Sequence, residues 1–295
     1  MASKVRGVVI SFIDMNNIMV LLATRGLALP VIVAERVDPA AYADRLGRLA
    51  GGLRSLTYRR ARRIVVQTRR AAKFFRSSRA SQVAIIPNPV NPAVTCARPA
   101  APGLDGRWRI IGIGRFDHQK GFDLLIDGFA GLAAQFADWD VVIFGDGPQR
   151  DALQAQIDSC ALSSRISLRS PTKDIAGELA RSHLMAFPSR FEGFPNALAE
   201  AMAVGLPAVA FADVSGVEEL IVPGVSGLLV PWGDGTAAAA VEALSAGLAT
   251  LLASAELRTS IGSAASAGVR AFAPPSIFPQ WDELLAAVRR AGASA

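Results

Sequence analysis

Two glutamates stand eight positions apart in the stretch Phe191–Met202, with a Gly-Phe-Pro turn between them. Pro195 suits the first turn of a helix and a Gly-Leu-Pro sequence ends it, so we expect a helix over residues 196–204. Glu192 then lies at the helix N-terminus and Glu200 within the helix. An open helix N-terminus attracts a phosphate, and neighbouring carboxylates can hold hydroxyl groups. The structural alternative is a core helix with a capping glutamate.

Two glycine-containing turns could add positive charge to such a site. The segment Ile111–Gly121 follows a predicted strand and carries Arg115 and Lys120. Its glycine spacing fits neither the dinucleotide fingerprint nor the NTPase phosphate loop. Arg can grip a phosphate with two parallel hydrogen bonds and Lys adds a point charge. The segment Phe144–Pro148 predicts a second tight turn at the same sheet edge, where open α/β sheets bind ligands.

The elements that position these residues alternate between strands and helices. Continuous β-branched runs are typical of parallel strands covered on both faces. The pattern predicts strands over 8–12, 31–34, 64–67, 83–86, 109–113, 140–144, 165–168, 184–188, 208–211 and 227–230. Helices are expected over 16–24, 69–75, 122–136, 150–161, 175–181, 196–204 and 281–290. Repeated βα units indicate an α/β protein with two doubly wound parallel sheets.

A proline-rich stretch at residues 87–106 is the best candidate for a domain boundary. We therefore expect a first Rossmann-like domain over 1–103, a second over 104–274, and a C-terminal helix over 275–295 that returns to the first domain. The Asp-x-Asp sequence at 138–140 precedes its strand, whereas a metal site belongs after one, so we interpret it as structural.

Charge is distributed unevenly along the chain. The net charge is +6, yet residues 45–79 hold twelve Lys or Arg and no acid. This Arg45–Arg79 block predicts attraction to an anionic surface, such as lipid headgroups; a solvated arginine-rich helical face is the alternative. Aromatic residues for base stacking are sparse there, which argues against nucleic acid. Two distant cysteines favour a reducing cytosol, and we expect neither a transmembrane helix nor a signal peptide.

Several motifs together resemble the retaining glycosyltransferases of family 4. They are Gly114-Arg115 with Lys120-Gly121, Gly145-Asp146-Gly147-Pro148, and the segment from Pro188 to Pro207 with its two glutamates. The resemblance covers about residues 5–290 in order and implies the GT-B fold. The residues of these motifs most resemble those of bacterial enzymes that extend exopolysaccharide or lipid-linked oligosaccharide chains.

The resemblance assigns a role to each matching residue. Arg115 and Lys120 would hold the diphosphate of a nucleotide sugar, beside Gly114. Glu192 would contact the hydroxyls of the donor sugar and Glu200 the ribose. Backbone N–H groups around Phe194, Pro195, Asn196 and Ala197 would bind phosphate at the helix N-terminus, although Pro195 itself has no N–H to donate.

The implied reaction moves a hexose to an acceptor hydroxyl with retention of anomeric configuration. We expect a UDP- or GDP-linked donor, a glycan or polyprenyl-diphosphate-linked acceptor, and no cofactor or metal, because cations and the helix dipole stabilise the leaving diphosphate. We expect the protein in the cytoplasm, peripheral at the inner face of the plasma membrane.

The first domain departs from the family pattern, because about 100 residues precede the boundary where the family has about 170. The opening strand, glycine-rich loop and histidine of that domain have no counterpart here, so we expect a truncated first domain. Two alternatives follow: a non-catalytic nucleotide-sugar-binding remnant or partner subunit, and a GT-B nucleotide-sugar epimerase.

Overall fold

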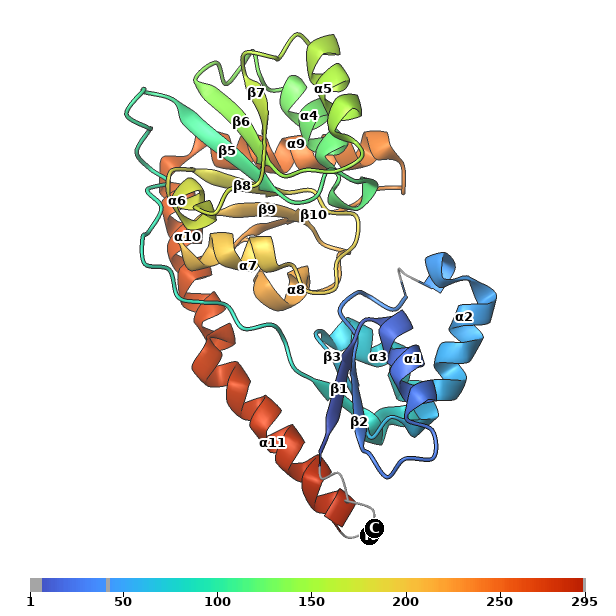
Figure 1. The fold of residues 1–295 in the computed structure, drawn as a ribbon. Helices are drawn as coiled ribbons and strands as arrows, with labels where there is room; N and C mark the ends of the chain where they lie inside the picture. The colour runs from blue at the N-terminus through green and yellow to red at the C-terminus, as the bar shows by residue number, and fades with distance from the viewer. Residues whose placement is uncertain (1–6, 41–42, 294–295) are drawn as a thin grey trace. The chain divides into compact units, whose positions relative to one another are not determined.

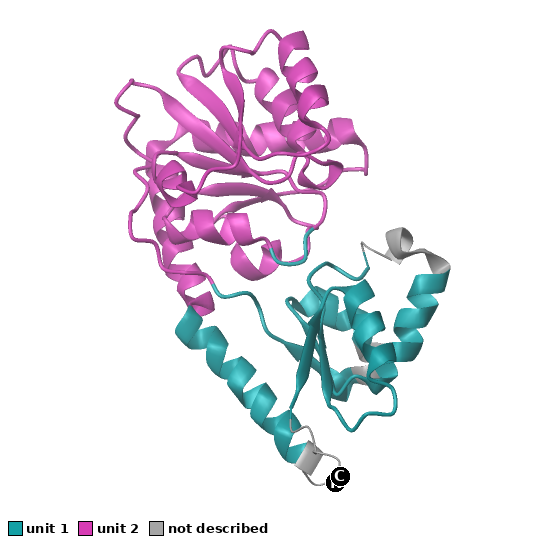
Figure 2. Ribbon diagram, in the orientation of Figure 1, with its two compact units in different colours: residues 1–89, 192–194, 274–295 teal, residues 90–191, 195–273 magenta. Residues whose placement is uncertain are grey.

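The chain forms two compact units (Figure 2). The structure, a computed structural model, describes residues 7–40 and 43–293, with the side chains of 43–48, 76–79 and 292–293 outside the description. Unit 1 consists of Met1–Pro89, Glu192–Phe194 and Pro274–Ala295. Unit 2 consists of Val90–Phe191 and Pro195–Ala273. The predicted division at 103–104 stays a prediction.

Unit 1 is built on a four-stranded parallel sheet in the order β1-β2-β3-β4. Its strands are β1 (Val9–Phe12), β2 (Val31–Ala34), β3 (Arg63–Val66) and β4 (Val83–Ile85). Its helices are α1 (Asp14–Ala23), α2 (Ala43–Thr57), η1 (Tyr58–Arg60), α3 (Arg69–Arg79), η2 (Ala80–Gln82) and α11 (Pro274–Ala293). Sequential strands therefore lie side by side, each joined to the next by a helical crossover.

Both faces of this sheet are covered. On one face, Val33 and Ile64 pack with Ile18 of α1, Tyr58 and Phe75. On the other face, side chains of β2 and β3 pack against α11, whose buried residues are Ile277 and Val288. The continuous β-branched runs of β2 and β3 match this burial, since a parallel strand presents both of its faces to apolar neighbours.

Unit 2 is built on a six-stranded parallel sheet in the order β10-β9-β8-β5-β6-β7 (Figure 1). Its strands are β5 (Trp108–Ile113), β6 (Trp139–Phe144), β7 (Ile166–Arg169), β8 (Leu184–Phe187), β9 (Ala208–Phe211) and β10 (Leu228–Val230). Its helices are η3 (His118–Lys120), α4 (Phe122–Ala130), α5 (Arg150–Ser159), α6 (Ile175–Ala180), α7 (Asn196–Ala203), α8 (Val217–Leu220), α9 (Ala237–Ala253), α10 (Ala255–Val269) and η4 (Arg270–Phe272). The order of the strands reverses at β5 and β8, so a ligand is expected at the carboxyl ends of these two strands.

The predicted fold class is confirmed: two α/β domains with parallel sheets. Several element bounds differ from the prediction, and one helix was missed. The helix expected over 122–136 ends at Ala130, because Gly131 caps it and the chain continues in turns. Helix α2 had no predicted range, since its residues were assigned to the basic block, with an arginine-rich helical face as the alternative.

Across the described ranges, no single helix has the length and apolar composition needed to cross a membrane. One pair of helices, Ala237–Ala253 with Ala255–Ala291, passes the same test jointly but is bent by 104° at the break.

Candidate functional site

The ends of β5 and β6 meet in a backbone contact that admits only glycine. A Cβ on Gly145 would lie 1.8 Å from the carbonyl oxygen of Gly114, a distance that no real contact allows. The turn after β6 then docks on the turn after β5, with the Phe116 N–H donating to the Asp146 carbonyl at 2.8 Å. The two glycine turns of the sequence therefore lie side by side at the carboxyl edge of the sheet.

The two predicted cations lie in the turn after β5. Arg115 is exposed, and its guanidinium pairs with Asp117 at 2.9 Å. The Asp117 side chain also caps η3 by accepting from the Lys120 N–H. The Lys120 ammonium lies 5.7 Å from the centre of the Phe187 ring, at the end of β8. Both charges are thus held at the strand ends where the sheet order reverses.

Gly121, between η3 and α4, packs against the segment that follows β8. It adopts φ +67°, and a Cβ there would lie 2.1 Å from the Pro188 carbonyl oxygen. The N–H of Arg190 donates to the Gln119 carbonyl at 2.8 Å, and the Gln119 side chain donates to the Phe191 carbonyl at 2.9 Å. These contacts fix the turn with the cations against the segment that leads into α7.

An ion pair that the sequence did not predict secures this arrangement. Arg190 donates from both terminal nitrogens to the Asp123 carboxylate, at 2.8 and 2.6 Å, and also to the His118 carbonyl. Burial opposes the ionisation of Asp123, but the hydrogen bonds and charge of Arg190 outweigh it and lower the pKa of this carboxyl. The partners are 67 positions apart, and no spacing signal connects them. Arg190 thus holds the segment after β8 against η3 and the first turn of α4.

Helix α7 confirms the predicted helix from Asn196 onward. Pro195 occupies the N-cap position and contributes no side-chain hydrogen bond to the first turn. The apolar side chains of α7, among them Leu198 and Met202, are buried. Glu200 is exposed on the opposite side of the helix, and desolvation by its surroundings raises the pKa of its carboxyl.

Unit 2 therefore brings together Gly114, Arg115 and Lys120 with the segment that leads to α7. Glu192 and Phe194 are buried, and they belong to unit 1 together with Gly193. The roles assigned to all of these residues by resemblance stay predictions. The described residues contain no group of three or more His, Cys, Asp or Glu side chains placed to hold a metal ion.

A second polar cluster lies at the carboxyl edge of the unit 1 sheet. Glu35, directly after β2, is 5% exposed and accepts a hydrogen bond from the Tyr58 hydroxyl at 2.5 Å. The Asn17 amide donates to the Tyr58 oxygen at 2.9 Å. Burial, partly offset by the Tyr58 hydrogen bond and the charge of Arg54, raises the pKa of Glu35 to about 7. Burial and the nearby Glu35 also raise the pKa of Tyr58.

Residues 98–267, more than half of the chain, match the family described as "Glycosyl transferases group 1". The chain belongs to this family. An exopolysaccharide phosphotransferase of Streptomyces coelicolor is 35% identical over 225 residues, which are 75% of this chain and 23% of that protein. A lipopolysaccharide core biosynthesis mannosyltransferase of Rhizobium leguminosarum is 36% identical over 58% of this chain and 48% of that protein. The group 1 chain thus spans less than half the length of these relatives.

Solved structures confirm the GT-B fold. Anabaena HepE in complex with UDP superposes with a TM-score of 0.79 at 19% identity, covering 95% of this chain and 79% of that chain. At this identity the likeness shows the fold alone.

Proposed function

We propose that this group 1 family member is a retaining glycosyltransferase that takes a hexose from a nucleotide-diphosphate sugar. The observation that supports this most directly is the pairing of two cations with a helix start. Arg115 and Lys120 lie in a turn that is hydrogen-bonded to the segment entering α7. Two positive side chains and the positive end of a helix dipole suit a diphosphate.

The proposed chemistry assigns the leaving group to unit 2. As the glycosidic bond to the diphosphate breaks, negative charge grows on the phosphate oxygens. Arg115, Lys120 and the first-turn N–H groups of α7 stabilise that charge in place, since they are fixed before the reaction. Glu200 accepts hydrogen bonds from the ribose, and Glu192 from hydroxyls of the donor sugar. The transfer proceeds with retention and uses no metal.

Calorimetry with UDP and with GDP tests the donor site. Truncating Lys120 to Ala removes one charge-assisted hydrogen bond to phosphate, worth about 1.5–3 kcal/mol, so we expect about 10- to 100-fold weaker binding. Lys173→Ala is a matched control, because Lys173 is exposed in the loop after the edge strand β7, two strands away from β5. The proposal would be refuted if the two variants bound the nucleotide with equal affinity, or if the folded chain bound neither UDP nor GDP.

We propose a glycan or polyprenyl-diphosphate-linked sugar as the acceptor, in surface polysaccharide synthesis. The names of the bacterial relatives support this class. The alternatives of a nucleotide-sugar-binding remnant and of an epimerase share the donor site. The two apolar clusters that cover both faces of the unit 1 sheet favour a working enzyme over a remnant, since a remnant needs no ordered first unit. Transfer of radiolabelled sugar to a lipid acceptor separates the three.

We also propose that unit 1 binds an anionic membrane at the inner face of the plasma membrane. Helices α1 and α2 pack together and each exposes apolar side chains at helical spacing. These are Met15, Met19 and Leu22 on α1, and Leu49, Leu53 and Leu56 on α2. Among the described side chains of the basic block, Arg59, Arg60, Arg62, Arg69, Arg70 and Lys73 are exposed. Exposed apolar groups beside cations are typical of interfacial binding.

Co-sedimentation with vesicles rich in phosphatidylglycerol at low salt measures this association. We expect Leu49→Gln to reduce the bound fraction, because its side chain is 92% exposed and would enter the lipid interface. Leu104→Gln, equally exposed in unit 2, serves as the control. A bound fraction that both variants leave unchanged would contradict the proposal.

A further inference from the structure

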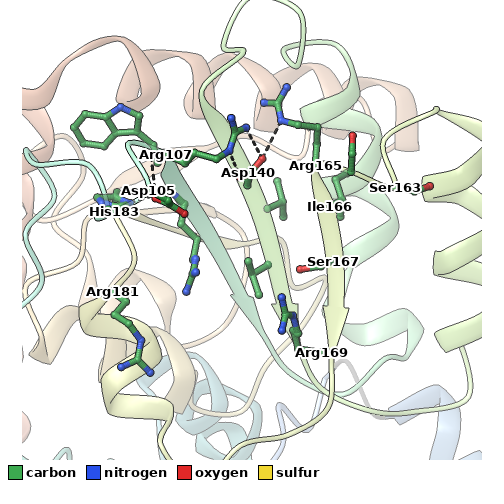
Figure 3. A pocket seen from close by; sticks show the side chains of 16 residues that line it. Asp105, Arg107, Asp140, Ser163, Arg165, Ile166, Ser167, Arg169, Arg181 and His183 are labelled. Atoms are coloured by element: carbon green, nitrogen blue, oxygen red, sulfur yellow. Dashed lines mark hydrogen bonds and ion pairs between the residues drawn. The ribbon is translucent and has the colours of Figure 1, made fainter.

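A pocket of about 270 Å³ lies in unit 2 over the strands β5, β6 and β7 (Figure 3). It starts at the amino ends of these strands, whereas the candidate donor site lies after their carboxyl ends. Alternate residues of a strand share a face, which places Arg109 of β5, Val142 of β6 and Ser167 of β7 on one face. The lining includes five arginines, which are Arg107, Arg109, Arg165, Arg169 and Arg181.

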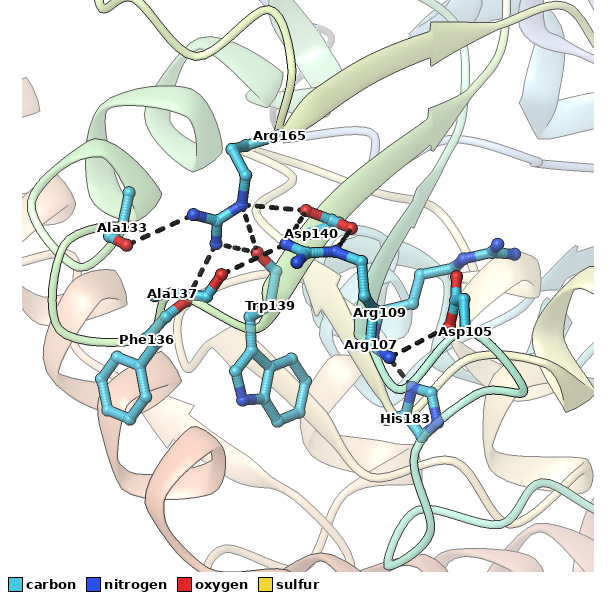
Figure 4. Close-up of polar contacts among 10 residues, drawn as sticks. All are labelled: Asp105, Arg107, Arg109, Ala133, Phe136, Ala137, Trp139, Asp140, Arg165 and His183. Carbon is cyan, nitrogen blue, oxygen red and sulfur yellow. Dashed lines mark hydrogen bonds and ion pairs between the residues drawn. The ribbon is translucent and has the colours of Figure 1, made fainter.

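Two of these arginines hold the sheet together. Arg107 and Arg165 both pair with the carboxylate of Asp140, at 2.7 Å from Arg107 Nη2 and 2.9 Å from Arg165 Nε (Figure 4). Arg165 also donates to the carbonyls of Phe136 and Trp139. Asp140 thus joins residues that flank three adjacent strands, and these ion pairs account for Asp140 without a ligand.

The other three arginines keep most of their donors. Arg109 and Arg181 share one carboxylate, that of Glu178, at 3.0 and 2.7 Å, and Arg181 also contacts Asp174. Arg169 is exposed and takes part in no ion pair within the part of the chain that the structure describes. Each guanidinium carries five N–H donors. The three side chains therefore present many more donors than these two carboxylates can accept.

The remaining ionisable groups of the lining do not offset this surplus. Burial lowers the pKa of His183 to about 4, so its imidazole is neutral at pH 7. Its Nδ1 accepts the N–H of Arg109 at 2.8 Å, which fits a neutral ring. The Asp105 carboxylate accepts the N–H of Arg107 at 3.0 Å. Acidic groups at the rim are engaged, while guanidinium donors face the pocket.

We propose that this pocket is a second anion site, which binds a small phosphorylated sugar. Arg109 stands near the start of β5 and Arg169 at the end of β7, two strand spacings across the sheet and four residues along it. Their Cα atoms are thus about 16 Å apart, and the two side chains reach the pocket from opposite ends. Planar guanidinium forks suit phosphate oxygens, and the Ser167 hydroxyl between them suits a sugar hydroxyl. The volume is just below the ~300–1,000 Å³ of drug-sized ligand pockets, which restricts the occupant to about the size of a hexose phosphate.

This site is separate from the candidate donor site of the same unit. Arg109 and Arg115 are six residues apart along β5 and the turn that follows it. Six residues of extended chain span about 20 Å. A ligand held at Arg109 therefore leaves Arg115 and Lys120 accessible. Arg169 lies at the carboxyl edge, where its carbonyl accepts the Gly145 N–H at 2.9 Å, so the measurements below must distinguish its side chain from the donor site.

Calorimetry with glucose 6-phosphate, and separately with inorganic phosphate, tests the proposal on the full chain. Arg169→Gln removes an exposed guanidinium without breaking an ion pair, so we expect the fold to persist and hexose phosphate binding to weaken about tenfold or more. Arg270→Gln, an exposed arginine on η4, is the matched control and should bind as the unaltered protein does.

Two further measurements separate this site from the donor site. Lys120→Ala should bind glucose 6-phosphate normally, and Arg169→Gln should bind UDP normally. Inorganic phosphate that binds as tightly as the sugar phosphate, with the same dependence on Arg169, would support the anion site and define phosphate itself as the ligand. An absence of binding, or binding that Arg169→Gln leaves intact, would overturn the proposal whatever the outcome with UDP.

Discussion

Glu35 should make the stability of unit 1 depend on pH. Its carboxyl is buried beside the Tyr58 hydroxyl, and the charged groups that face it are Arg54 and Asp14. Burial raises its pKa from 4.5 to about 7. A carboxyl whose pKa is raised by folding stabilises the fold when protonated, so its contribution is fully present below pH 4.5 and is lost as the pH rises to about 7.

The size of the effect follows from that pKa. Each tenfold change in proton affinity is worth about 1.4 kcal/mol. The rise to about 7 therefore corresponds to about 3 kcal/mol that unit 1 loses between pH 4.5 and 7. Glu35→Gln keeps the shape and an acceptor for Tyr58 but cannot ionise. We expect the variant to be more stable than the unaltered chain above pH 7, by up to about 3 kcal/mol.

Hydrogen exchange of the amides in β2 and β3 measures the opening of unit 1 separately from unit 2. The free energy of opening, corrected for the intrinsic exchange rate, should fall with rising pH in the unaltered chain. It should be nearly flat in Glu35→Gln. Glu283→Gln is the control, because Glu283 is exposed on α11 of the same unit. Parallel pH profiles of the unaltered chain and Glu35→Gln would refute the reasoning.

Three further substitutions test how unit 2 is held together, each by denaturant unfolding. Gly121→Ala should lower the free energy of unfolding by at least about 2 kcal/mol, because φ is +67° and a Cβ would lie 2.1 Å from a carbonyl oxygen. Gly224→Ala is the control and should lower it by about 1 kcal/mol, because φ is +73° there but the surrounding space is open. Asp140→Asn should lower the free energy of unfolding by about 1–2 kcal/mol, since two partly exposed arginines lose the carboxylate that they share. An equal loss in Asp174→Asn, whose ion pair with Arg181 is exposed, would contradict this. Arg258→Met should cost about 3 kcal/mol, because three carbonyls lose the donor that a buried guanidinium supplies, and Arg258→Lys should restore part of it.

Local sequence patterns predicted most of the elements around the candidate site. The strands at Val31–Ala34 and Ala208–Phe211 have the predicted bounds, because β-branched runs between polar turns leave little ambiguity. The start of α7 at Asn196 followed from Pro195 in the same way. Short-range signals of this kind depend on backbone geometry within a few residues.

Features that depend on strand order and register were beyond the reach of the sequence. The pocket requires β5, β6 and β7 to be adjacent, with Arg109 opposite Asp140 and Phe144 opposite Arg169. Register is set by packing across the whole sheet, and no local spacing encodes it. The link between Arg190 and Asp123 has the same origin, because it joins the loop after β8 to the first turn of α4.

The glycines and the cations of the turn after β5 have different physical reasons to be there. Gly121 and Gly145 leave no space for a side chain, so the fold requires them whether or not a ligand binds. Arg115 and Lys120 are not needed in that sense, since the exposed guanidinium of Arg115 could be shortened without a cavity. A motif that combines both kinds of residue is evidence of function through its charges, and evidence of fold through its glycines. Substitutions of the two kinds must therefore differ: loss of Lys120 should weaken nucleotide binding at unchanged stability, whereas Gly121→Ala should weaken both.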